Sequence, residues 1–151
     1  MSVRSAVCTV LNPSQSRRVT TDAISRDPIL NHHHIAFVYS CKTGRILANG
    51  TNRITSTGSV HAEVDALNNL HARVRDRVCA PREYSRGVNM ITLRVSQGGE
   101  LRLAKPCVAC AAALKRCVLI KRIEWSDQDG DVVGERLQQF NPTHVSAAAL
   151  A

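Results

Sequence analysis

The chain has 151 residues, of which 44% are hydrophobic and 21% are charged, an ordinary composition for one globular domain. No apolar run approaches the length of a membrane-spanning helix, and the apolar residues 6–11 are too few for a secretory signal. We therefore expect an intracellular protein, cytoplasmic or nuclear, with no membrane partner. The net charge of +8 favours nucleic acids or phosphorylated small molecules, while an aromatic content of 3% argues against a surface that stacks bases.

The first clear structural pattern is a β-hairpin. The first thirty residues give only a weak pattern for a short helix within residues 20–30. Residues 35–40 then predict a strand, residues 42–44 a turn and residues 45–50 the returning strand.

A helix follows this hairpin, and it carries a histidine and a glutamate at its start. The pattern predicts that the helix begins near Val60, with Ser59 as its cap. His61 and Glu63 then lie in the first turn. Because side chains two positions apart do not share a helix face, Glu63 is poorly placed to bind the same ion as His61.

The second half of the chain contains two strands and a helix that starts with a pair of cysteines. Residues 88–95 and 101–103 predict strands. Pro106 suits the first position of a helix, and Cys107 and Cys110, three positions apart, then place their sulfurs on one side of its first turn. The positive end of the helix dipole favours both thiolates.

The last elements predict an antiparallel strand pair. Residues 120–125 read as a strand, residues 126–130 as a turn and residues 131–137 as a returning strand. A parallel final strand needs a crossover of about a dozen residues or more, and too little chain remains for it.

Three of these side chains are typical zinc ligands. His61, Cys107 and Cys110 supply one imidazole and two thiolates and leave a fourth position open, as in catalytic zinc sites. Glu63 is suited to carry protons beside such a site. The alternative is a structural zinc site, which normally has four protein ligands, and an inactive descendant of an enzyme is a further alternative.

The segments His61-Ala62-Glu63 and Pro106-Cys107-Val108-Ala109-Cys110 resemble the H-x-E and P-C-x-x-C motifs of the cytidine deaminase-like superfamily. The resemblance covers about residues 35–137. It implies an α/β fold, a three-layer α/β/α sandwich around a mixed sheet of about five strands. Residues 1–151 would then form a single zinc deaminase domain, in which residues 1–30 are poorly defined.

The resemblance also implies roles for individual residues. His61, Cys107 and Cys110 would bind Zn²⁺, zinc hydroxide would attack C4 of cytosine, and Glu63 would carry the proton to the ring nitrogen N3. Asn52 would hydrogen-bond the sugar or base, and backbone groups of Ala62 would lie near the pocket. Trp125 would stack on a base. The alternatives are a turn residue for Asn52 and a core or interface residue for Trp125.

The subfamily cues are mixed. In the superfamily, an antiparallel last strand pair goes with deaminases of free cytidine, and a parallel pair with tRNA adenosine, deoxycytidylate and polynucleotide deaminases. Lys105 stands where tRNA adenosine deaminases commonly carry an acidic residue, and Val108 replaces a glycine of the nucleoside enzymes. The residues that follow His61 are closer to the nucleotide and tRNA branch.

We expect a deaminase that converts cytosine to uracil in a free (deoxy)cytidine nucleoside or nucleotide, assembled as a homo-oligomer. One alternative is a polynucleotide deaminase acting on tRNA or single-stranded DNA, since nucleic acid is a candidate partner. The other is a noncatalytic, zinc-stabilised interaction protein.

Overall fold

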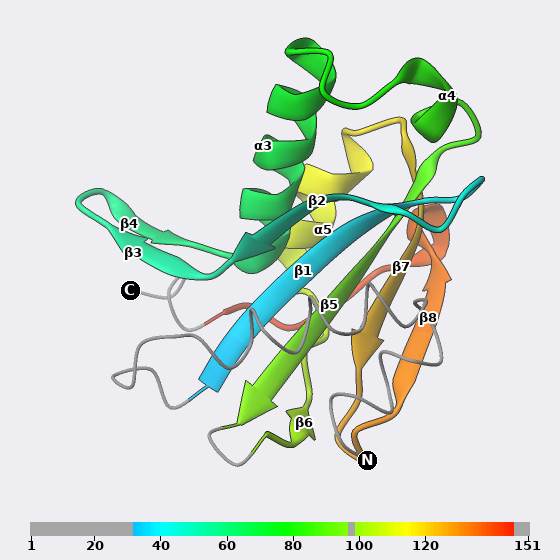
Figure 1. Ribbon diagram of the computed structural model, residues 1–151. Coiled ribbons are helices and arrows are strands. Elements are labelled where there is room, and N and C mark those ends of the chain that lie inside the picture. Colours follow the sequence, from blue (N-terminus) through cyan, green and yellow to red (C-terminus); the bar gives the residue numbers. More distant parts are fainter. Residues whose placement is uncertain (1–31, 97–98, 147–151) are drawn as a thin grey trace.

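The computed structural model describes residues 32–96 and 99–146, and the helix expected within residues 20–30 lies outside them. The elements are shown in Figure 1. The strands are β1 (His32–Ser40), β2 (Ile46–Thr51), β3 (Arg53–Thr55), β4 (Gly58–Val60), β5 (Val88–Ser96), β6 (Leu101–Arg102), β7 (Ile120–Ser126) and β8 (Val132–Arg136). The helices are α3 (Ala62–Arg75), α4 (Pro81–Tyr84) and α5 (Val108–Lys115), followed by the 3-10 turn η1 (Leu137–Gln139).

The strands form a mixed sheet in the order β2-β1-β5-β7-β8, and β6 pairs with the end of β5. β1 is antiparallel to both β2 and β5, whereas β5 and β7 are parallel and are connected through α5. β8 runs antiparallel to β7. The α/β class, the mixed sheet and the antiparallel last pair are therefore confirmed.

β5 lies in the middle of the sheet and shows why its sequence is so apolar. Its side chains alternate between the two faces of the sheet, and Val88, Met90, Ile91, Leu93 and Val95 are all buried. A strand that is covered on both faces reads as a nearly continuous apolar run rather than as an alternating one.

The described helices cover one face of the sheet. Ala66 and Leu70 of α3 and Leu114 of α5 share a buried cluster with Met90 and Ile123 from the strands. The opposite face carries a second buried cluster made from strand residues alone. One helical layer of the expected three-layer sandwich is thus present, and the second layer stays a prediction because no described helix contributes to that face.

The start of α3 differs from the prediction. Ser59 does not cap the helix, because β4 pairs with β3 in a short hairpin that holds the chain extended as far as Val60. The hairpin projects from the body of the molecule in Figure 1. His61 is the N-cap residue, with φ −75° and ψ 152°, and α3 begins at Ala62. Glu63 lies in the first turn, as predicted.

The start of α5 is also later than predicted. Cys107 has an extended backbone (φ −78°, ψ 172°) and is the N-cap residue, so Pro106 precedes the cap instead of occupying the first helical position. Among the described residues, no helix is both long enough and apolar enough to cross a membrane.

Candidate metal centre

The N-termini of α3 and α5 meet, and they bring the three predicted zinc ligands together. Nδ1 of His61 lies 3.1 Å from Sγ of Cys110 and 3.6 Å from Sγ of Cys107. One donor atom from each residue lies within 4.8 Å of the other two. The group forms although His61 is separated from the cysteines by 46 and 49 positions in the sequence.

The three donors suit zinc in their chemistry and spacing. In a tetrahedral site with Zn–S bonds of about 2.3 Å and Zn–N bonds of about 2.0 Å, sulfur and nitrogen ligands lie about 3.6 Å apart. The separation of Cys107 and His61 matches this value, and that of Cys110 and His61 is shorter. Soft thiolates combined with an imidazole favour zinc over magnesium or calcium.

The two cysteines of the group are buried. Cys107 is 4% exposed and Cys110 is 2% exposed. Burial, reinforced by Glu63 and Cys107, raises the pKa of the Cys110 thiol far above its usual range. A divalent cation favours the thiolate form of such a group, and the partial positive charges at the two helix N-termini act in the same direction.

Glu63 lies beside the three donors without belonging to their group. Its Oε2 is 3.8 Å from Sγ of Cys110, and the residue is 5% exposed. Burial raises the pKa of this carboxyl group, while its own backbone N–H, His61 and Cys110 act in the opposite direction. A buried carboxyl group next to a metal-binding group can exchange protons with a water held there.

Hydrogen bonds fix the segment that carries the cysteines. The Ala104 N–H donates to the Ser126 carbonyl oxygen at 2.8 Å, and Ser126 Oγ donates to the Arg102 carbonyl oxygen at 2.6 Å. These bonds tie the approach to Cys107 to the end of β7. The first N–H of α5, from Val108, donates to the His144 carbonyl oxygen at 3.1 Å, so the segment after η1 satisfies a free end of the helix.

Asp65 and Gly50 fix the helix that carries His61 and Glu63. The Asp65 carboxylate accepts a hydrogen bond from the Thr51 N–H at 3.1 Å and pairs with Arg53 at 2.6 Å. A Cβ atom on Gly50 would lie 2.1 Å from the Ala66 nitrogen, so β2 and α3 are in direct backbone contact. Asp65 is 7% exposed and was missed by sequence reasoning, although an acid three positions after Ala62, on the same buried face of α3, was a usable signal.

Asn52 and Ala62 lie on either side of the β3–β4 hairpin. The Asn52 side-chain oxygen accepts a hydrogen bond from the His34 N–H at 3.1 Å, and the Asn52 N–H donates to the His34 carbonyl oxygen at 3.4 Å. Asn52 therefore anchors the chain to β1. Ala62 is 1% exposed and adjoins His61 at the start of α3. Their contacts with a substrate stay predictions.

Trp125 is a core residue in this structure. It is 7% exposed, and its ring centroid lies 5.1 Å from that of Phe140. Lys105, the residue before Pro106, places its ammonium 5.7 Å from the Trp125 ring centroid and 5.8 Å from that of Phe140. These distances are typical of cation–π contacts. Stacking of Trp125 on a base stays a prediction.

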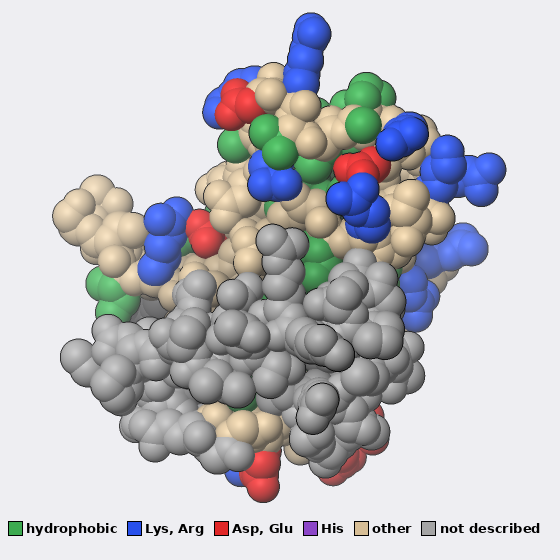
Figure 2. All heavy atoms as spheres, in the orientation of Figure 1, with side chains coloured by type: hydrophobic (Ala, Val, Ile, Leu, Met, Phe, Trp, Pro, Cys, Tyr) green, Lys and Arg blue, Asp and Glu red, His purple; other side chains and the backbone are tan. Residues whose placement is uncertain are grey.

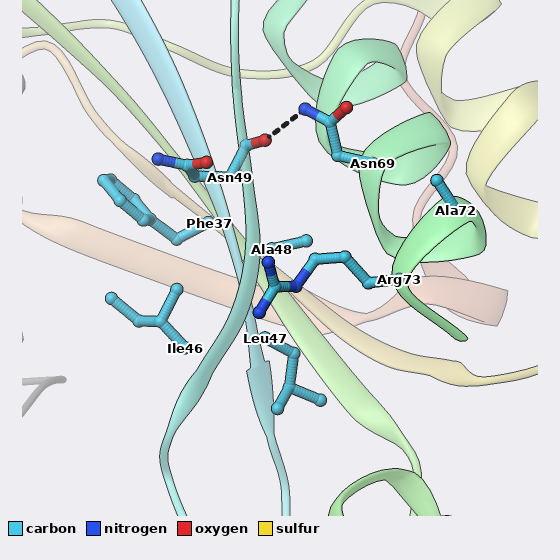
Figure 3. Close-up of a pocket in the computed structure, with 8 residues that line it drawn as sticks. All are labelled: Phe37, Ile46, Leu47, Ala48, Asn49, Asn69, Ala72 and Arg73. Atoms are coloured by element: carbon cyan, nitrogen blue, oxygen red, sulfur yellow. Dashed lines mark hydrogen bonds between the residues drawn. The ribbon is translucent and has the colours of Figure 1, made fainter. Parts of the chain in front are cut away.

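Two cavities lie outside the metal centre. The first, about 420 Å³, lies between β2 and α3 and is drawn in Figure 3. There Arg73 extends from α3 toward β2, and Asn69 Nδ2 donates to the Asn49 carbonyl oxygen at 2.7 Å. The second, about 940 Å³, lies at the far end of α5. Neither is lined by His61, Cys107 or Cys110.

No protein-family model and no curated protein sequence matches the chain. Among solved structures, it is similar to cytidine deaminases from Mycobacterium leprae (18% identity, 85% of this chain and 94% of the other, TM-score 0.49) and Burkholderia pseudomallei (17%, 80% and 88%, 0.47). It is also similar to a dCMP deaminase from the cyanophage S-TIM5 (18%, 78% and 86%, 0.41). At such identities and TM-scores, support for a function has to come from the residues of this chain.

Proposed function

We propose that the protein is a zinc-dependent hydrolytic deaminase that converts cytosine to uracil in a free (deoxy)cytidine nucleoside or nucleotide. The observation that supports it most is the group of His61, Cys107 and Cys110, with the buried Glu63 carboxyl group 3.8 Å from Cys110 Sγ. Three protein ligands with an adjacent acid are typical of a catalytic zinc site, whereas a structural site normally has four protein ligands.

The reaction adds water at C4 of cytosine, breaks the bond between C4 and its amino nitrogen, and releases ammonia. When bound, zinc lowers the pKa of a water molecule to about 7, so that a nucleophile is present at neutral pH. Glu63 takes the proton that the water loses, delivers it to N3, and assists the departure of ammonia. Its burial favours proton transfer to the substrate over exchange with bulk solvent.

The direction of the last strand of the sheet supports a substrate that is a free nucleoside or nucleotide and not part of a polymer. β8 is antiparallel to β7, the arrangement that the resembled superfamily associates with deaminases of free cytidine. In this proposal Asn52, whose Nδ2 makes no hydrogen bond within the described residues, contacts the sugar or base. In the same proposal, the backbone of Ala62 and the ring of Trp125 also contact the substrate.

The proposal extends to the whole chain. Residues 1–151 form one deaminase domain that acts as a homo-oligomer in the cytoplasm. Two other functions are weighed against it. The net charge of +8 favours a deaminase of tRNA or single-stranded DNA, and a metal-binding group without turnover would belong to a noncatalytic zinc protein.

A product assay tests the proposal. Zinc-loaded protein is incubated with cytidine, deoxycytidine, their monophosphates and a single strand containing cytosine and adenine, and the products are analysed by mass spectrometry. We expect a gain of about one dalton on a free nucleoside or nucleotide, and a rate about 10²- to 10⁴-fold lower for Glu63→Gln. Zinc content should be unchanged in this variant.

The other outcomes of this assay would contradict parts of the proposal. A gain on the strand alone would assign the protein to the polynucleotide deaminases. No product from any substrate, with zinc bound, would support the noncatalytic function. Equal rates for wild type and Glu63→Gln would remove Glu63 from the mechanism.

A further inference from the structure

The 940 Å³ cavity lies at the opposite end of α5 from the zinc ligands. Its lining comes from the end of α5 and the turn after it, from Asn89 of β5, from the first residues of β7 and from the junction of β8 and η1. We call it the basic groove. The eight residues of α5 span about 12 Å, so the groove is distinct from the metal centre.

The charge of the groove has one sign. Lys115, Lys121, Arg122 and Arg136 line it, and no aspartate or glutamate of residues 32–96 and 99–146 does. Within the described residues, none of the four forms an ion pair. Two of them have neutral acceptors, since Lys115 Nζ donates to Asn141 Oδ1 at 3.0 Å and Lys121 Nζ donates to the Val118 carbonyl oxygen at 3.1 Å. Figure 2 shows Lys and Arg side chains projecting along the edge of the molecule beside β7 and β8.

Two of these cations are direct neighbours across the sheet. Arg122 on β7 and Arg136 on β8 are register partners, so their side chains leave the same face of the sheet side by side. Like charges in this position repel each other. Glu124 lies on the same face of β7, two residues after Arg122. Its carboxylate accepts a hydrogen bond from the Tyr39 hydroxyl. The repulsion is relieved when an anion lies between the two guanidinium groups.

We propose that the basic groove binds the phosphate backbone of a nucleic acid. Its four cations are exposed and spread over several elements, which suits an extended polyanion better than one small anion held by converging buried donors. No aromatic side chain from the described part of the chain lines the groove, so these residues offer phosphate contacts and no platform for stacked bases. Asn89, Gln138 and Gln139 add neutral hydrogen-bonding groups. This inference does not depend on the deaminase proposal.

The test measures binding of an oligonucleotide that the zinc site cannot convert. Fluorescence anisotropy follows a labelled oligouridylate of roughly 20 nucleotides, which has no exocyclic amino group. The Arg122→Gln/Arg136→Gln variant should bind about tenfold more weakly than wild type at low salt, and the slope of log Kd against log salt should fall by about 1.4. The matched control is Arg73→Gln/Arg82→Gln, which removes two exposed arginines that lie outside the groove and form no ion pair with any residue the structure describes. This control should bind within about twofold of wild type.

Several results would overturn the proposal. Equal weakening in both double variants would mean that net charge alone attracts the strand. Displacement of the strand by tripolyphosphate at the same phosphate concentration would mean that the groove takes a free polyphosphate, and displacement by polyglutamate would indicate an acidic protein. Absence of binding at low salt would also refute it. Thermal unfolding checks that the variants fold, and Arg136→Gln alone replaces the double variant if that one does not.

Discussion

The two ends of α5 are built in opposite ways. At its N-terminus, Cys107 and Cys110 are buried and converge with His61 on a volume that one ion can fill. At its C-terminus, the cations of the basic groove are exposed, form no ion pair with another described residue, and lie in part side by side. Convergent, buried donors select a small ion, whereas exposed cations suit a long, hydrated polyanion. Substitutions at the two ends should therefore differ in the sign of their effect on stability as well as in size.

The largest effect is expected when a thiolate is removed from the converging end. Cys110→Ala leaves two donors, so zinc content should fall from about one ion per chain to near zero, and the thermal unfolding temperature should fall with it. Elemental analysis of the purified protein measures the first, and calorimetry the second. Cys117→Ala is the control, because Cys117 is also buried but lines the groove. Loss of zinc in Cys117→Ala would contradict the separation of the two ends.

A substitution at the contact between β2 and α3 should have the next largest effect on stability. A Cβ atom at position 50 would meet backbone atoms of Ala66 and Ala62 at 2.1 and 2.6 Å, and backbone cannot yield as a flexible side chain can. Gly50→Ala should lower the free energy of unfolding by about 3 kcal/mol. Gly44→Ala is the control: Gly44 has open space around its Cβ position but a φ of +70°, so it should lose only about 1 kcal/mol. Urea denaturation that ranks the two variants in the reverse order would refute the close contact.

Loss of the Asp65 side chain should lower the free energy of unfolding less than the substitution of Gly50 does, and more than loss of any surface acid. Asp65→Ala leaves the Thr51 N–H without its acceptor and Arg53 without its partner, so it should lower the free energy of unfolding by about 1–3 kcal/mol. In the control Asp76→Ala, an exposed pair with Arg75 is lost and the change should stay below about 0.5 kcal/mol. Equal changes in the two variants would show that Asp65 does not hold the start of α3.

The two ends of α5 also differ in how far the sequence predicts their structure. The sequence predicted that His61, Cys107 and Cys110 act together because of their residue types and spacing, whatever the exact helix boundaries, and the structure brings their donor atoms together. The starts of α3 and α5 each lie about two residues later than predicted. For α3 the cause is the β3–β4 hairpin, whose pairing no local sequence pattern indicates. The basic groove was not found at all. Arg122 and Arg136 become neighbours only through the register of β7 and β8, which depends on the whole sheet.

The smallest expected effect has the opposite sign. Arg136→Gln removes one of two like charges that face each other across β7 and β8, and no ion pair between described residues is lost with it. The free energy of unfolding should rise by about 0.2–0.5 kcal/mol at low salt, because both side chains are exposed. The gain should vanish at high salt, where the repulsion is screened. Arg82→Gln, which removes an exposed arginine of α4, should change stability at neither salt concentration. A loss of stability in Arg136→Gln would mean that Arg136 holds the end of β8 in place, and the arginine pair would then belong to the fold and not to a binding surface.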